Sequence, residues 1–106
     1  MTSDQDWLPN DTAHLSATGG TPLNGTLTIT LYESNNCSGT AVSGQTYSFD
    51  ITNATSPVNR STSNSTYLVT ADKTVSWKVE FSPDAGSNVT GSSHCETSSV
   101  TVTNNP

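Results

Sequence analysis

Three segments of the chain alternate hydrophobic and polar residues with a period of two, the pattern of a β-strand with one buried face. They span residues 26–33, 46–52 and 74–81, and no segment shows the period of an amphipathic helix. Because one face of each strand is apolar, these faces are expected to pack together in a single core. The residues expected in this core are Leu27, Ile29, Leu31, Phe49, Trp77 and Val79.

Weaker strand patterns and turn-rich stretches fill most of the remaining chain. Weaker strands are expected at residues 12–18, 65–70 and 98–103, and stretches rich in Gly, Pro, Asn and Ser at 19–25, 35–44, 53–64 and 83–93. Short strands separated by such turns predict an all-β fold, a two-sheet antiparallel β-sandwich with about seven strands. A small closed barrel is the alternative. Residues 1–10 have no period and are expected to be a lead-in or linker, with residues 11–104 as one domain.

Composition separates this chain from disordered proteins. Of its 106 residues, 17 are Ser, 19 are Thr and 10 are Asn, whereas only 11% are charged and 30% hydrophobic. Disordered chains combine low hydrophobicity with high charge and few aromatic or β-branched residues. Thr, Val and aromatic residues, which this chain does contain, are favoured on half-buried strands. The composition therefore predicts a folded domain with a polar but largely uncharged surface.

Charge and motif content exclude several functions. The net charge is -6 with only three Lys and Arg residues, so the chain has no basic patch for nucleic acid. No apolar run is long enough to insert into a membrane. The two histidines, His14 and His94, lie in no nucleophile motif, and no Gly-rich phosphate loop is present. We expect no enzyme activity, no catalytic residues, and no cofactor or metal site.

The two cysteines favour a disulfide bond. Cys37 follows the first strong strand and Cys95 precedes the last expected strand, so a bridge would join loop or strand-end residues. Closing a loop of this length contributes about 4 kcal/mol in the chain-entropy description. An even pair of cysteines in such a domain indicates an oxidising, extracytoplasmic setting. The alternative is two unpaired, buried thiols.

Short motifs along most of the chain resemble the bacterial Ig-like repeat domains of large cell-surface and secreted proteins. The motifs are Gly-Thr-Leu-Thr-Ile-Thr-Leu-Tyr-Glu at 25–33, Asn-Cys-Ser-Gly at 36–39, Trp-Lys-Val-Glu-Phe-Ser-Pro-Asp at 77–84, Ser-His-Cys-Glu at 93–96 and Val-Thr-Val at 100–102. The likeness covers about residues 9–104 and includes the cysteine positions of a Cys-bearing subset. Pro83 stands where this family commonly has glycine, so the turn there is expected to differ.

This resemblance implies an Ig-like sandwich that serves as a tandem-repeat stalk or spacer on the cell surface or in a secreted protein. Its expected partners are neighbouring domains of the same polypeptide, and the domain itself is expected to be a monomer. The alternative is an adhesin-type module that binds carbohydrate or a host protein through the turn-rich stretches 35–44 and 53–64. Trp7 and Tyr67 would stack on sugars if they were exposed.

The sequence also raises two hypotheses about the surface, calcium binding and N-glycosylation. Asp4, Asp6 and Asp11 form the densest acidic group, and calcium binding there is the alternative to a purely solubilising role, since carboxylates are its usual ligands. The glycosylation motif Asn-x-Ser/Thr occurs at Asn10, Asn24, Asn36, Asn53, Asn59, Asn64 and Asn88. This count is about twice what chance gives in so Ser- and Thr-rich a chain, which makes N-glycosylation a hypothesis.

Overall fold

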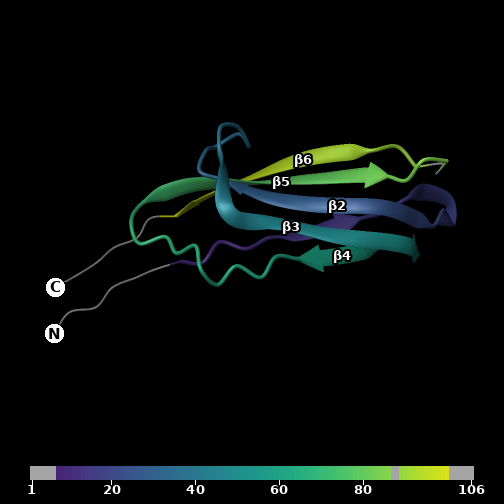
Figure 1. Ribbon diagram of the computed structural model, residues 1–106, viewed down its shortest axis with the longest axis horizontal. Coiled ribbons are helices and arrows are strands. Elements are labelled where there is room, and N and C mark those ends of the chain that lie inside the picture. The colour runs from purple at the N-terminus through teal and green to yellow at the C-terminus, as the bar shows by residue number, and fades with distance from the viewer. Residues whose placement is uncertain (1–6, 87–88, 101–106) are drawn as a thin grey trace.

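Two antiparallel β-sheets form the computed structural model, which describes residues 7–86 and 89–100. The strands are β1 (Thr12–Leu15), β2 (Leu23–Tyr32), β3 (Ala41–Ala54), β4 (Val58–Ser61), β5 (Lys73–Pro83) and β6 (Ser92–Val100), with a short 3-10 turn, η1, at Thr18–Gly20. One sheet has the order β3-β2-β5-β6 and the other pairs β1 with β4 (Figure 1). The predicted all-β sandwich is confirmed, with six strands in the described part of the chain. No helix among these residues is long and apolar enough to cross a membrane.

The strongest sequence pattern becomes the central strand of the larger sheet. β2 pairs with β3 on one edge and with β5 on the other. Leu27 therefore stands between Phe49 and Phe81, and Leu27, Ile29 and Leu31 are fully buried. Since side chains alternate between the faces of a strand, this register places one apolar face against the second sheet.

Fewer of the predicted core residues are buried than the sequence pattern indicates. Leu27, Ile29, Leu31 and Trp77 are buried, whereas Phe49 and Val79 are only partly buried and pack against the core from its sides. Phe49 lies on the edge strand β3, and Val79 pairs with His94 of the opposite edge strand, β6. The physical reason is that a sheet of two strands cannot cover a sheet of four.

The strand expected at residues 65–70 does not form, and an asparagine explains why. The Asn64 side chain is buried, and its Nδ2 donates to the carbonyl oxygens of Pro9 and Tyr67. Its Oδ1 accepts hydrogen bonds from the backbone N–H groups of Thr66 and Tyr67. Such local side-chain bonds compete with strand pairing. The segment keeps one bridge, in which Val69 and Trp7 exchange backbone hydrogen bonds of 2.9 and 2.8 Å.

The bounds of β1, β4 and β6 differ most from the prediction. β1 is shorter than the expected strand 12–18, and β4 lies inside the expected turn stretch 53–64. Val58 of β4 is buried opposite Leu15 of β1, but a strand of four residues is too short to show a period in the sequence. β6 begins at Ser92 rather than at residue 98, and positions 101–103 of the expected strand lie outside the described residues. Its side chains are almost all polar because the second sheet leaves them uncovered.

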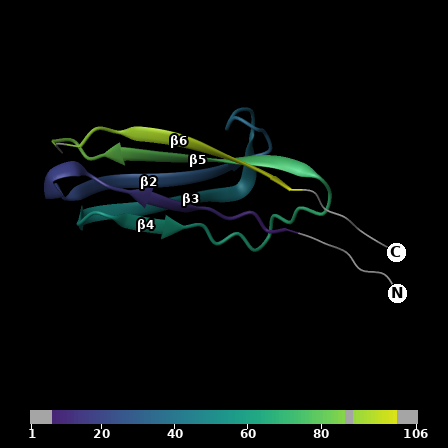
Figure 2. The same ribbon diagram turned by 180° about the vertical axis from the view of Figure 1, so that it is seen from behind.

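The described chain enters and leaves the sandwich at the same end. Trp7 is bridged to Val69, and Val100 pairs with Lys73, only a few residues further along the chain. β1 starts near this end and β6 finishes there, as the view from behind shows (Figure 2). A pulling force on the two ends would therefore act on β1 and β6 first.

Candidate functional site

The first predicted site, the disulfide, is present. Cys37 and Cys95 are bridged with a Cα–Cα distance of 6.0 Å. Cys37 lies in the loop after β2, where its N–H donates to Oγ of buried Ser76 on β5 at 2.9 Å. Cys95 was expected at a strand end but lies in the middle of β6, opposite Lys78 of β5. Because β5 separates β2 from β6, the bridge ties an edge strand across its neighbour to the loop of the central strand.

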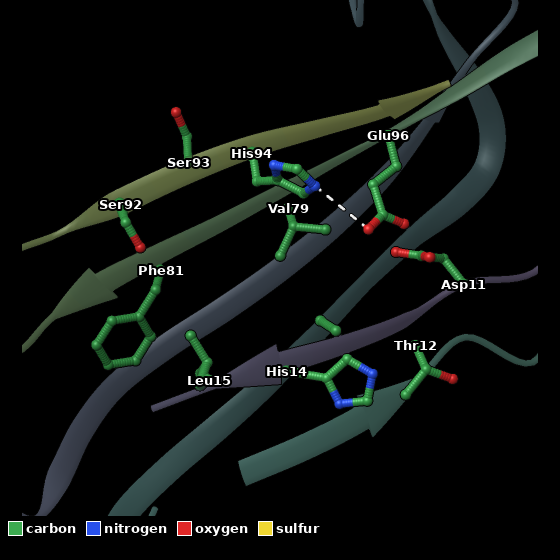
Figure 3. Close-up of a pocket in the computed structure, with 11 residues that line it drawn as sticks. Asp11, Thr12, His14, Leu15, Val79, Phe81, Ser92, Ser93, His94 and Glu96 are labelled. Carbon is green, nitrogen blue, oxygen red and sulfur yellow. Dashed lines mark hydrogen bonds and ion pairs between the residues drawn. The ribbon is translucent and has the colours of Figure 1, made fainter. Parts of the chain in front are cut away.

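A cavity of about 300 Å³ opens between the two sheets on the side of β1 and β6. Its lining comes from the whole of β1 and the residue before it, from β5 and from β6, namely Asp11, Thr12, Ala13, His14, Leu15, Val79, Phe81, Ser92, Ser93, His94 and Glu96. The apolar members come from β1 and β5, and the polar residues Asp11, His94 and Glu96 lie together at one end (Figure 3). Within the described residues, β1 pairs only with β4 and β6 only with β5, so the cavity lies between two unpaired strand edges.

Two carboxyl groups from different sheets face each other at one end of this cavity. Asp11, which precedes β1, points toward Glu96 of β6 (Figure 3). Oδ2 of Asp11 is buried and has no hydrogen-bond partner. The backbone around Asp11 is fixed, since its N–H donates to Thr62 Oγ1 at 2.9 Å and its carbonyl accepts from the Thr62 N–H. The carboxyl group is therefore held in the cavity by its own backbone.

This arrangement shifts the pKa values of the two carboxyl groups in opposite directions. Partial burial of Asp11, together with the neighbouring Glu96 carboxyl, raises the pKa of Asp11 from 3.8 to about 6. The hydrogen bond from the Asp11 carboxyl and the contact with His94 lower the pKa of Glu96. His94 Nε2 lies 3.2 Å from Glu96 Oε1. Near pH 5 the pair thus shares one proton, with Asp11 as the donor.

The strongly basic side chains are all engaged elsewhere. Lys73 forms an ion pair with Glu33, which also accepts a hydrogen bond from the Tyr67 hydroxyl at 2.6 Å. Lys78 Nζ lies 3.6 Å from Glu80 Oε1. Arg60 donates from Nη1 to the Asn59 carbonyl oxygen at 2.8 Å. These are the three Lys and Arg residues of the chain, so the basic residues beside the carboxyl pair are the histidines His94 and His14.

The remaining expected sites are dispersed. Asp4 and Asp6 lie outside the described residues, and no group of three or more His, Cys, Asp or Glu in the described part could hold a metal ion. Trp7, expected in the lead-in, is partly buried against the core, and so is Tyr67. The stretch 53–64 contains β4, and the stretch 35–44 carries the disulfide and the start of β3. Neither aromatic residue is therefore a free stacking surface.

The glycosylation motifs fall into different environments. Asn64 is buried with its amide nitrogen bonded, which leaves it unavailable in the folded domain. Asn24 is half-buried, and Asn88 lies outside the described residues. The exposed positions are Asn10, Asn36, Asn53 and Asn59. Four of the seven motifs thus combine the sequence signal with surface exposure in the described part of the chain.

Sequence reasoning missed the cavity. Its polar residues on β6 alternate as Ser92, His94 and Glu96, a period of two that carries no apolar signal. The contact of Glu96 with Asp11 depends on which strands face each other, which local patterns do not reveal. Comparisons with known protein families, characterised proteins and solved structures found no match to this chain.

Proposed function

We propose that this domain is an Ig-like structural spacer of an extracytoplasmic microbial surface or secreted protein, of the tandem-repeat stalk type. The observation that carries this proposal is the disulfide, which ties edge strand β6 to the loop after central strand β2. Disulfides persist in oxidising compartments, so the bridge suggests an extracytoplasmic environment. The placement on a cell surface rests on the sequence resemblance.

The strand order supports the Ig-like part of the proposal. In immunoglobulin-type sandwiches, strands C′, C, F and G form one sheet, and strands B and E pair in the other. The orders β3-β2-β5-β6 and β1-β4 correspond to these two groups in chain sequence. The hairpins β2–β3 and β5–β6 then take the places of C–C′ and F–G. This correspondence also leaves the place of a first strand, A, beside β1.

The position of the bridge fits a mechanical role. Force applied beyond Val100 would peel β6 from β5 starting at the Lys73 pair, because the chain leaves at that end. Peeling stops at Cys95, where the covalent bond passes the load to Cys37 and so to β2. The chain between the two cysteines, a sequence separation of 58, cannot extend while the bridge is intact.

Single-molecule extension between the two ends of the domain tests this role. A chain segment of 58 steps spans about 200 Å when extended at about 3.6 Å per residue. Unfolding in the presence of a reductant should therefore lengthen the chain by about 200 Å more than unfolding without it. The Cys37→Ser/Cys95→Ser variant serves as the matched control and should show the long extension in both buffers. Equal extensions of the oxidised and reduced protein would contradict the mechanical role.

One observation favours the second candidate, an adhesin-type binding module: the cavity between β1 and β6. Concave sites with apolar walls and a few convergent polar groups are where small ligands bind. A glycan array and a pull-down with host proteins test this alternative. If both are blank with the oxidised domain, the binding function is rejected and the spacer function stands.

A further inference from the structure

The edge of the sandwich beside β1 and β6 is incomplete in the described residues. Among residues 7–86 and 89–100, the outer edge of β1 has no strand partner, and neither does the outer edge of β6. On β6, the side chains that face the second sheet are Ser92, His94 and Glu96, and all three are exposed. Exposed side chains on an inward face mean that the two-stranded sheet ends too early to cover them. A third strand beside β1 would lie over this face.

The floor of the opening suits the side chains of a strand. Ala13 and Leu15 of β1 and Val79 and Phe81 of β5 supply its apolar lining. Leu15 and Val79 are only partly buried, although both pack against the core. Aliphatic side chains of an added strand would therefore cover apolar surface that now faces solvent.

The two carboxyl groups at one end of the cavity between β1 and β6 are suited to bind a basic group. Asp11 and Glu96 bring two carboxyl groups together, and buried Oδ2 of Asp11 has no hydrogen-bond partner. The Lys and Arg side chains of this chain are engaged at Glu33, Glu80 and the Asn59 carbonyl. Among the described residues, the basic side chains beside the pair are the histidines His94 and His14, so a Lys or Arg at this position would have to come from another polypeptide segment.

We propose that the opening between β1 and β6 binds an extended peptide that pairs with the free edge of β1 and places a Lys or Arg side chain on Asp11 and Glu96. Strand addition of this kind takes its affinity from main-chain hydrogen bonds and its specificity from pockets for alternate side chains. Here the apolar floor would take two aliphatic side chains and the carboxyl pair the basic one. This binding site includes His94 and Glu96, the chain neighbours of the bridged Cys95, but it does not depend on the spacer function.

The spacing on β1 fixes the sequence of a probe. Asp11, Ala13 and Leu15 point to one side, since side chains two residues apart share a face. An antiparallel partner would place side chains opposite Leu15, Ala13 and Asp11, in that order. The capped peptide Ser-Val-Thr-Val-Thr-Lys-Ser meets this pattern. The matched control peptide carries Glu in place of Lys.

Titration of the oxidised domain with each peptide, followed by two-dimensional NMR of the backbone amides, tests the proposal. The Lys peptide should shift the amides of residues 11–15 and 92–96, and should bind about fivefold to tenfold more tightly than the Glu peptide. In the Asp11→Asn/Glu96→Gln variant, which preserves side-chain shape, this preference should fall to about twofold or less. The Asp50→Asn variant, which changes an exposed carboxylate on β3, should keep the full preference.

Several results would overturn the proposal. They are the absence of shifts at residues 11–15 with millimolar Lys peptide, shifts confined to the edge of β3, and equal affinity for the two peptides.

The pH dependence of the preference for the Lys peptide is a second test. Burial raises the pKa of Asp11 to about 6, so the preference for Lys should grow from pH 5 to pH 7.5 as Asp11 ionises. The other titratable groups beside the pair are His94 of β6 and His14 of β1. A preference that is independent of pH would contradict the role of Asp11.

Discussion

Removing the charge of Asp11 should change how the stability of the domain depends on pH. Burial beside Glu96 raises the pKa of Asp11 from 3.8 to about 6. Between these values the folded protein binds more protons than the unfolded chain, so the free energy of unfolding falls as pH rises. The loss is complete once the pH exceeds the folded pKa. The Glu96 pKa is lowered instead, so its contribution is lost only in acid, as pH falls below its usual range.

The size of the effect follows from the shift. A pKa change from 3.8 to about 6 would correspond to about 3 kcal/mol if it were fully expressed. Asp11 is only partly buried, and solvent screening reduces this to about 1–2 kcal/mol. The wild-type domain should therefore lose about 1–2 kcal/mol of stability between pH 4.5 and pH 7.5 through this group.

Urea unfolding of the oxidised domain at half-unit pH steps measures this loss. Asp11→Asn should flatten the curve between pH 4.5 and pH 7.5, and should be more stable than the wild type at pH 7.5 because it removes the repulsion with Glu96. Asp50→Asn removes one exposed carboxylate from β3 and should keep the wild-type slope. If Asp11→Asn and the wild type show the same slope, or if wild-type stability rises across this range, the proton-sharing pair is refuted.

Two further variants test the hydrogen bonds of Asn64 and the contribution of the disulfide to stability. Asn64→Ala removes side-chain hydrogen bonds to Pro9, Thr66 and Tyr67 and should lower the free energy of unfolding in urea by about 2–4 kcal/mol. The control Asn36→Ala, at an exposed position, should lower it by less than about 0.5 kcal/mol. Similar losses for the two variants would show that Asn64 does not organise its segment. Cys37→Ser/Cys95→Ser opens a loop of sequence separation 58 and should cost about 4 kcal/mol, measured in the same way. A loss below about 1 kcal/mol would mean that the bridge does not stabilise the fold.

The central sheet could be predicted because its information is local. Leu27, Ile29 and Leu31 alternate with Thr along one strand, and burial of a single face needs no knowledge of the partner strands. β4 and β6 could not be placed correctly for opposite reasons. β4 is only four residues long, and β6 carries polar side chains on both faces. Periodicity reports burial, so a strand that is hardly buried gives no signal.

The candidate site depended on tertiary contacts that the sequence does not contain. The cysteine pair was predictable because an even pair in a domain of this composition already indicates a bridge. The position of Cys95 within β6 was not, since the start of that strand was misplaced. The meeting of Asp11 and Glu96 requires the narrow second sheet to end beside β6. Likewise, the bond from the Asn64 amide to Pro9 joins positions 55 residues apart, which no local pattern reveals.

The account depends most directly on the bond between Cys37 and Cys95 in the protein as its own host makes it. Mass measurement of the native protein under non-reducing conditions, with peptide mapping, tests that bond. We predict a mass two hydrogens below that of the reduced chain and a single linked peptide pair containing Cys37 and Cys95. The mass of the fully reduced chain, with both thiols open to alkylation, would contradict the disulfide and the oxidising location inferred from it.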